Sequence, residues 1–438
     1  MEGGGVVQGV LLVIIFFIAF FVFLLMGVPI TFSLGASGTL SLLLSGQQLT
    51  LLVRSMFSPF ESFTLLAIYL FTFMGVIFQK TGMASLLTDA LMPIVGRFRG
   101  GLALVTTYGS AFFGALTGSA NATCATFAKL MGPEMVKRGY PRPWTTAVIA
   151  SASPLGQLIP PSLTCIVLGV ATGTSIAALF TVDLAIGILT LIFMTTLILI
   201  IARKRNYGST TEKFTRKEAI ERITKALPLA GVPLIVLGGM YGGVFTPTEA
   251  GAIGSLVSLI LAVVYRKLTP RSFYETVIDS AATTGMVLLL IAASYVVSYV
   301  MSFTGITQWF INFLTGLSGK SGYIGLLFLV VILLIMGCFI DLIVLCIILA
   351  PTAVAALAPL GINPYHINAL FLIGNLIGII TPPVGVALFT SSFVLNEKIE
   401  KVSKELVPFI LMYIIITIII VLFPDSVLWL PRVLGFNV

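Results

Sequence analysis

The sequence predicts an all-α polytopic membrane protein in which one helical unit occurs twice, with opposite orientations. First, 58% of the 438 residues are apolar, 9% are charged and the mean hydropathy is +1.12, which excludes a soluble globular domain. Second, the segment Ile159-Pro160-Pro161-Ser162 recurs 222 positions later as Thr381-Pro382-Pro383-Val384. Third, Lys and Arg cluster in short loops between apolar runs, where they favour the cytoplasmic side of a membrane.

The two Pro-Pro pairs predict broken helices, because proline lacks an N–H group and its ring clashes with the preceding turn. A break inside the membrane frees backbone amides and carbonyls, which only protein or a polar cavity can satisfy. Paired breaks in two halves therefore point to the binding site of a secondary transporter. The alternative is that these Gly and Pro residues are kinks packed between helices.

The first half is expected to contain N-terminal scaffold helices and the first repeat. Residues 1–61 hold spans near 6–26 and 29–46. The repeat, 62–182, then holds a span at 62–80, an interfacial arm at 83–96, a hairpin at 100–140 and a broken helix at 143–175. Basic residues flank 100–140 on both sides and its centre is small and polar, which predicts a re-entrant hairpin with its tip in the membrane.

The second half is expected to repeat this plan after a central scaffold, 183–276, with spans near 183–202, 227–245 and 249–266. The loop 203–225 carries eight basic and three acidic residues, which places it in the cytoplasm. The second repeat, 277–396, holds a span at 277–302, an arm at 304–317, a hairpin at 322–360 and a broken helix at 366–395. A C-terminal arm and scaffold helix, 397–438, include a last span at 406–423.

Charge placement predicts that the first repeat starts inward and the second outward, which is an inverted-topology repeat. Only Arg54, Lys320 and Arg432 of the 24 Lys and Arg residues fall on the predicted outer side. Both termini are then expected outside.

Four interruptions, two hairpin tips and two breaks, are expected to meet near the bilayer midplane. Unwound carbonyls and helix C-terminal ends suit Na⁺, and half-helix N-termini suit a carboxylate. Ser119, Asn121 and Thr123 offer polar side chains in the first tip, although each could instead cap the tip or bond a neighbouring helix. Asp341 is the only acid in either tip, and it is expected either to bind an ion or to cap the next helix.

Other acids are expected to be structural. Thr246-Pro247-Thr248-Glu249 fits a capping box, so Glu249 is expected to start a helix. Asp183 begins an apolar run and is expected to cap it rather than carry a proton. Since interior carboxylates are few, Na⁺ coupling is favoured over H⁺ coupling.

Several classes of protein are excluded by missing motifs. The chain has no Gly-x-x-x-x-Gly-Lys-Ser/Thr segment for ATP hydrolysis, and its basic loops indicate membrane orientation rather than nucleic-acid binding. It has no GxSxG elbow and one histidine, His366, so no enzyme is expected. The scattered cysteines are expected to be buried hydrophobic residues: Cys124, Cys165, Cys338 and Cys346.

A series of motifs runs in order from Phe63 to Phe389. It comprises Gly100-Gly101-Leu102-Ala103, Thr117-Gly118-Ser119-Ala120, Pro133-Glu134-Met135, Gly139-Tyr140, Ile159-Pro160-Pro161-Ser162, Thr246-Pro247-Thr248-Glu249-Ala250 and Thr381-Pro382-Pro383-Val384-Gly385. Together these motifs resemble the large membrane subunit of tripartite ATP-independent periplasmic (TRAP) transporters. The chain departs from that family at Tyr69, where a proline is usual, and over Thr181 to Gly187.

The resemblance implies an ion-transporter-superfamily fold and an elevator, in which a hairpin-bearing domain slides against a scaffold. It implies Na⁺-driven import of an organic acid, such as a C4-dicarboxylate or sialic acid, across a bacterial or archaeal inner membrane with both termini periplasmic. The implied partners are a periplasmic substrate-binding protein and a small four-helix membrane subunit, expected as a separate chain because only two spans precede the first repeat. The alternatives are a stand-alone Na⁺-coupled divalent-anion symporter and, from another class, a channel or membrane scaffold.

The resemblance also implies site residues. The Na⁺ positions are expected at Gly118, Ser119, Asn121, Gly156, Gly337, Asp341, Gly378 and Thr381. Substrate is expected at Thr117, Ser119, Asn121, Pro160, Pro161, Ser162, Thr381, Pro382, Pro383 and Gly385.

Overall fold

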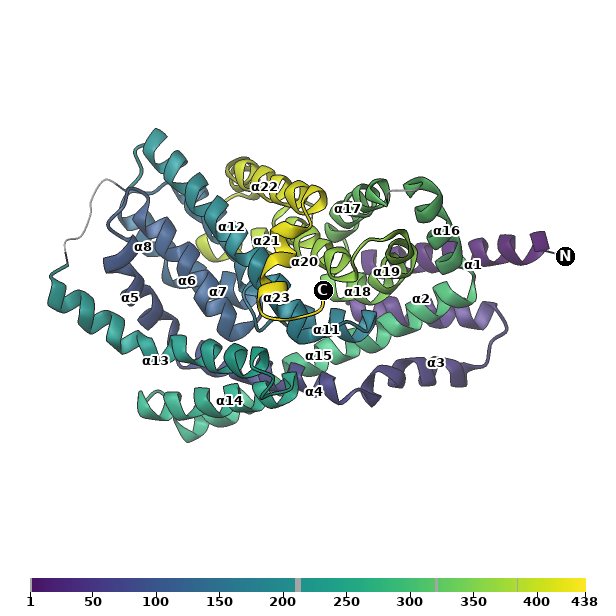
Figure 1. Ribbon diagram of the computed structural model, residues 1–438, viewed down its shortest axis with the longest axis horizontal. Coiled ribbons are helices and arrows are strands. Elements are labelled where there is room, and N and C mark those ends of the chain that lie inside the picture. The colour runs from purple at the N-terminus through teal and green to yellow at the C-terminus, as the bar shows by residue number, and fades with distance from the viewer. Residues whose placement is uncertain (1, 209–213, 320–321, 384) are drawn as a thin grey trace.

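The computed structural model describes residues 2–208, 214–319, 322–383 and 385–438, and all regular structure in these ranges is helical (Figure 1). Six of the described helices are long and apolar enough to cross a membrane, or up to eight if each bent pair counts as one span. This confirms the all-α polytopic class. Lys320, Val384 and part of the loop 203–225 lie outside the described residues.

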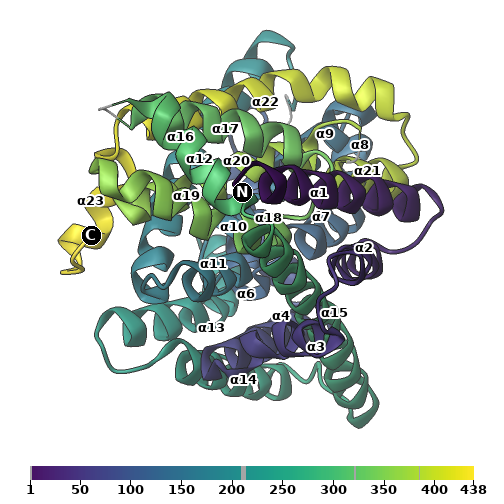
Figure 2. The same ribbon diagram turned by 90° about the vertical axis from the view of Figure 1, so that its right-hand side faces the viewer.

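A layer of helices packs around α15 and α4, and its members α3, α4, α13 and α14 are seen along the bottom in Figures 1 and 2. In it α15 packs against α2, α3 and α4, and α14 packs against α4 and α13. The bounds of the N-terminal helices are α1 (Glu2–Leu25), α2 (Ile30–Leu44), α3 (Leu49–Phe57) and α4 (Leu66–Lys80), with short 3₁₀ turns at Ser58–Glu61 and Phe63–Leu65. The others are α13 (Arg216–Tyr241), α14 (Pro247–Val264) and α15 (Pro270–Phe303).

The first repeat contains an arm, a hairpin and a broken helix, near the predicted positions. Its helices are α5 (Ala84–Val95), α6 (Gly101–Thr117), α7 (Ala120–Leu130), α8 (Gly132–Lys137), α9 (Arg142–Ala152), α10 (Leu155–Leu158) and α11 (Leu163–Thr172). The hairpin turns at Gly118, whose φ of 60° lies in the left-handed region that glycine adopts without a steric penalty. The chain bends by 48° between the segment Arg142–Leu158 and α11, across Pro160 and Pro161.

The second repeat has the same parts. Its helices are α16 (Ile306–Ser318), α17 (Tyr323–Gly337), α18 (Leu342–Ile348), α19 (Ala350–Leu357), a 3₁₀ turn at Ala358–Leu360, α20 (Pro364–Ile380) and α21 (Val386–Leu395). The hairpin tip lies between α17 and α18, and the break lies between α20 and α21. The Pro160–Pro161 and Pro382–Pro383 peptide bonds are both cis, so the two breaks share this local geometry.

The two repeats interlock at the centre of the molecule. Within each half, the first arm of the hairpin packs on the broken helix, α6 on α10 and α17 on α20. Across the halves, α7 packs on α21 and α18 packs on α11. This exchange brings both tips and both breaks into one region, as the pairing of the two interruptions predicted.

Several features differ from the sequence predictions, and both α13 and α15 start before the spans expected at 227–245 and 277–302. The helix expected at 183–202 is α12 (Ile176–Lys204). It starts earlier because Ser175 is its N-cap residue, whose side chain accepts a hydrogen bond from the Ala178 N–H group. Asp183 is therefore inside a helix, and its predicted capping role is wrong. The last span, α22 (Ile399–Leu422), also starts earlier than predicted. The helices α3 and α23 (Asp425–Val433) were not predicted, because neither is long enough to form an apolar span.

The prediction for Glu249 is confirmed. Thr246 Oγ1 accepts a hydrogen bond from the Glu249 N–H at 3.3 Å, and Glu249 Oε2 accepts one from the Thr246 N–H at 2.8 Å. The Glu249 carboxylate thus caps the start of α14, which is a structural role.

Candidate functional site

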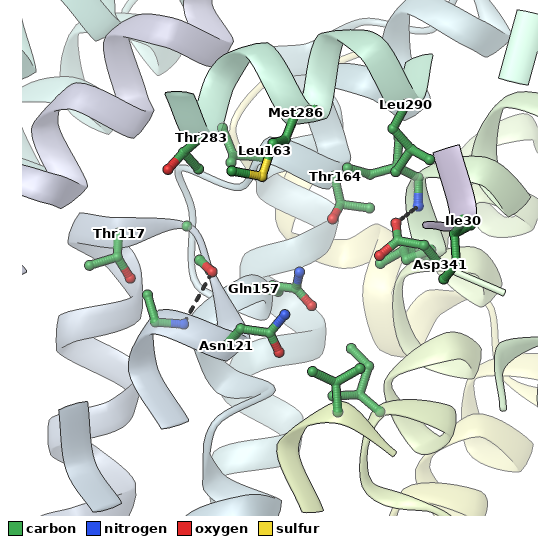
Figure 3. A pocket seen from close by; sticks show the side chains of 18 of the residues that line it. Ile30, Thr117, Asn121, Gln157, Leu163, Thr164, Thr283, Met286, Leu290 and Asp341 are labelled. Carbon is green, nitrogen blue, oxygen red and sulfur yellow. Dashed lines mark hydrogen bonds between the residues drawn. The ribbon is translucent and has the colours of Figure 1, made fainter. Parts of the chain in front are cut away.

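A cavity of about 540 Å³ lies where the two hairpin tips meet. Its walls come from both tips, from the start of α11 and α21, and from α2, α4 and α15. In Figure 3, Thr117 and Asn121 lie at one end of this pocket and Asp341 lies at the other. The pocket thus lies between the two repeats.

The first tip presents polar groups at a helix start. Ser119 is the N-cap of α7, and its Oγ accepts a hydrogen bond from the Ala122 N–H at 3.3 Å (Figure 3). Its backbone carbonyl accepts a bond from Thr123 Oγ1 at 2.8 Å. Asn121 lies two residues further along the chain and lines the pocket. The Ser119 hydroxyl therefore both caps the helix and faces the cavity, so the two predicted roles are compatible.

The second tip presents the single acid that was predicted. Asp341 is the N-cap of α18, and its Oδ1 accepts a hydrogen bond from the Ile343 N–H at 2.9 Å. Its side chain is exposed to the pocket. A carboxylate has two oxygens and about four acceptor sites, so capping leaves capacity to bind a cation. Asp341 can therefore act in both of its predicted roles.

Not all the predicted site residues reach the cavity. Those that line it are Thr117, Gly118, Ser119, Asn121, Gly337, Asp341, Gly378 and Gly385. The others belong to the two breaks and do not line it: Gly156, Pro160, Pro161, Ser162, Thr381, Pro382 and Pro383. Gly156 packs on Gly114 and Thr123, and Thr381 Oγ1 bonds back to the Ile377 carbonyl at 2.5 Å.

Several polar lining residues were not predicted. Gln157 and Thr164 flank the first break, and the Oε1 atom of Gln157 is buried with no hydrogen-bond partner among the described residues. The rest come from neighbouring helices, namely Thr31, Thr72, Gln79 and Thr283. Only Gln157 carried a usable signal, since it directly follows Gly156 in the predicted break.

The charge of the cavity is distinctive. Among the described lining residues, none is Lys, Arg or His, and Asp341 is the only acid. An anion in this pocket would have to be held by amides, hydroxyls, backbone N–H groups and any cation bound beside it. The described part of the chain also holds no group of three or more His, Cys, Asp and Glu side chains that could bind a metal ion.

The fold is that of a multi-span membrane protein with a pocket between its two repeats. A solved structure supports the fold: the YdaH transporter of Alcanivorax borkumensis superposes with a TM-score of 0.61 at 17% identity, covering 86% of this chain and 89% of that one. The protein-family model for the DctM component of tripartite ATP-independent periplasmic transporters matches residues 17–426 of this chain. The chain belongs to this family.

Relatives agree with this assignment. The chain is 34% identical to YgiK of Salmonella typhimurium, an uncharacterised protein, over 96% of this chain and 97% of the relative. It is 33% identical to the C4-dicarboxylate TRAP transporter large permease DctM of Pseudomonas aeruginosa, over 92% and 95%. It is 32% identical to the isethionate TRAP transporter permease DctMQ of Oleidesulfovibrio alaskensis, over 91% of this chain and 63% of that longer protein. The chain is thus a multi-pass membrane transport subunit and not an enzyme.

Proposed function

We propose that this chain is the transport subunit of a Na⁺-coupled, binding-protein-dependent importer of a small organic acid. The observation that carries the proposal is the cavity formed by both hairpin tips, each contributing a helix N-cap, Ser119 and Asp341. Discontinuous helices that meet at one pocket are the usual site of substrate and ion in secondary transporters.

Na⁺ would bind at the two tips. The turn at Gly118 and Ser119 offers backbone and hydroxyl oxygens, and the turn from Gly337 to Asp341 offers backbone carbonyls and a carboxylate. In the second half, Gly378 packs directly on the Gly337 carbonyl, which brings the break beside the tip. Oxygen ligands of this kind suit a hard cation without a buried cluster of acids.

The acid would bind between the tips. The cavity of about 540 Å³ is within the size range of small-molecule sites. Asn121, Gln157 and Thr164 can donate or accept hydrogen bonds there, and Na⁺ at the tips would supply the positive charge that the side chains lack. Relatives carry names for C4-dicarboxylate and isethionate transport, which supports an anionic substrate.

Transport would occur by an elevator mechanism. The interlocked hairpins and broken helices would slide against the layer of α2, α4, α13, α14 and α15. The pocket supports this division, because α2, α4 and α15 line it together with the two tips. A periplasmic binding protein and a small membrane subunit would complete the importer. The name and the greater length of the DctMQ relative, of which this chain covers 63%, support a second membrane subunit in the importer.

The test is uptake into proteoliposomes that contain this chain, its small membrane subunit and its binding protein. Radiolabelled succinate, isethionate and sialic acid are supplied with or without an inward Na⁺ gradient. The proposal requires saturable uptake that depends on both Na⁺ and the binding protein. Uptake by the chain alone would select the stand-alone symporter, and non-saturating flux indifferent to Na⁺ would select a channel.

A further inference from the structure

Asp183 is a fully buried acid that the proposed site does not use. It lies within α12 at 0% exposure, and it does not line the central cavity. Its Oδ2 accepts a hydrogen bond from Cys165 Sγ at 3.3 Å, whereas its Oδ1 has no partner among the described residues. Among the described residues, the one hydrogen bond that Asp183 accepts thus comes from a thiol, which is a weak donor.

The groups around Asp183 form a polar cluster between helices. Ser162 is the N-cap residue of α11, yet its side chain does not cap that helix. Its buried Oγ lies near Asp183 and has no hydrogen-bond partner among the described residues. The Tyr241 hydroxyl of α13 is also buried without a partner among the described residues. It interacts electrostatically with Asp183 through space. Besides Cys165, the Ser162 hydroxyl thus lies beside the carboxyl and has hydrogen-bonding capacity left.

The ionisable groups that face Asp183 offer it no positive charge. They are Cys165 on α11, Tyr241 on α13 and, beyond Cys165, Cys346 on α18. The other helices packed on α12 carry ionisable groups that are engaged elsewhere: Tyr108 with Thr195, Tyr365 with Ser175, His366 with the Ile420 carbonyl, Tyr413 with the Ser151 carbonyl, Glu405 with Arg205, and Asp425 with Arg432. Glu400, Lys401 and Lys404 lie in the first two turns of α22. None of the ion pairs in the described chain includes Asp183.

An unpaired carboxylate is very costly in an apolar interior, so a buried acid of this kind adopts its neutral form. An ionisable group at membrane depth is also a functional site by default. Sodium would need several oxygen ligands, but the one side chain that hydrogen-bonds Asp183 among the described residues donates a thiol proton instead of offering oxygen. A proton needs only Oδ1, the atom that lacks a partner among the described residues.

The first turn of α11 lies between Asp183 and the central cavity. Leu163 and Thr164 in the first turn of α11 line the cavity, whereas Ser162 and Cys165 are three residues apart, on the face of the same turn that meets Asp183. The first turn of α11 therefore contacts both the cavity and the Asp183 carboxyl.

We propose that Asp183 is a proton-binding site, which holds a proton while α11 packs on α12 and exchanges it with the cavity when that contact loosens. In the uptake step a hydronium ion transfers its proton to Oδ1, which yields a neutral carboxylic acid and a water molecule. The release step is the reverse. This chain would then bind a proton in addition to the ions at the hairpin tips.

The test is infrared spectroscopy of the purified full chain in lipid nanodiscs, because protonated carboxylic acids have a C=O stretching band distinct from carboxylate bands. At neutral pH we expect one such band that shifts in D₂O and bleaches reversibly as the pH is raised. It should vanish in Asp183→Asn and persist in the matched control Asp341→Asn. If Asp183→Asn does not fold, Asp183→Ser removes the same carboxyl.

Three results would overturn the proposal. The band could be unaffected by removal of the Asp183 carboxyl. It could persist through every pH at which the protein stays folded, which would make Asp183 a permanently neutral structural group. Finally, carboxylate bands that require Asp183 and shift when Na⁺ replaces K⁺ would identify a sodium ligand instead. The measurement needs no substrate, so its result is independent of the proposed transport function.

Discussion

Gly114 in the first hairpin packs against the backbone of Gly156 in the first broken helix, with no room for a Cβ at Gly114. The second half has an equivalent contact, since a Cβ on Gly378 would overlap the carbonyl of Gly337. In each half, the hairpin thus packs directly on the broken helix through contacts between glycine backbones. These two contacts hold each tip against the break of its own half.

Gly114→Ala and Gly378→Ala are expected to damage these contacts. Overpacking a methyl group against backbone lowers the free energy of unfolding by about 1–3 kcal/mol. Thermal unfolding in detergent measures the loss, and proteoliposome uptake should fall with it. The matched control is Gly285→Ala on α15, where an added Cβ meets nothing within 4 Å. Equal stability of all three variants would contradict the tight seating of the tips.

Asp341 allows its capping and ion-binding roles to be separated. Asn caps helices as well as Asp does, so Asp341→Asn should keep the stability of the protein, whereas Asp341→Ala should lose about 1 kcal/mol. Both variants remove the carboxylate from the pocket, so both should need more Na⁺ for half-maximal uptake. Ser119→Ala should also weaken Na⁺ dependence. An unchanged Na⁺ requirement in Asp341→Asn would limit this residue to capping.

Gln157 is expected to contact substrate, because it lines the pocket and its Oε1 is unpaired among the described residues. Loss of one hydrogen bond worth about 1.4 kcal/mol corresponds to about a 10-fold rise in the KM for uptake. Gln308→Ala on α16 is the control, since Gln308 is exposed and bonds Asn312 outside the pocket. If Gln157→Ala and Gln308→Ala have the same KM, Gln157 does not contact substrate.

Much of this architecture was predictable from local chemistry. Tandem prolines at Pro160 and Pro382 forced the breaks, and the small polar run around Gly118 could form only a hairpin tip inside a membrane. The Thr246 and Glu249 capping box was predictable for the same reason, since its bonds join residues three positions apart. Such features depend on neighbours in the sequence.

The capping box leads to a contrast between two variants. Glu249→Gln retains an acceptor for the Thr246 N–H group, so uptake and its Na⁺ dependence should be unchanged. Thr246→Ala removes the cap on the Glu249 N–H group and should lower the free energy of unfolding by about 1 kcal/mol. Chemical or thermal unfolding measures this loss. Abolished transport in Glu249→Gln, with normal stability, would show that the carboxylate has a functional role.

The features that were missed depend on tertiary packing. Thr72 on α4 and Thr283 on α15 line the pocket because those helices lie across from the tips, which no local pattern specifies. The burial of Asp183 followed from the early start of α12 at Ser175 and from its packing on α11. Ser162 was predicted at the substrate site but points to the Asp183 side of α11, since the direction of a side chain depends on the exact first residue of the helix.

The most direct test of the central claim, that the two hairpin tips bind Na⁺, is thermal unfolding of the purified chain in NaCl and in KCl of equal ionic strength. A ligand that binds only the folded state stabilises it by about 2.7 kcal/mol at 100 times its Kd. The unfolding midpoint should therefore rise with NaCl and not with KCl, and the rise should shrink in Asp341→Asn. Identical midpoints in the two salts at every concentration would contradict the claim.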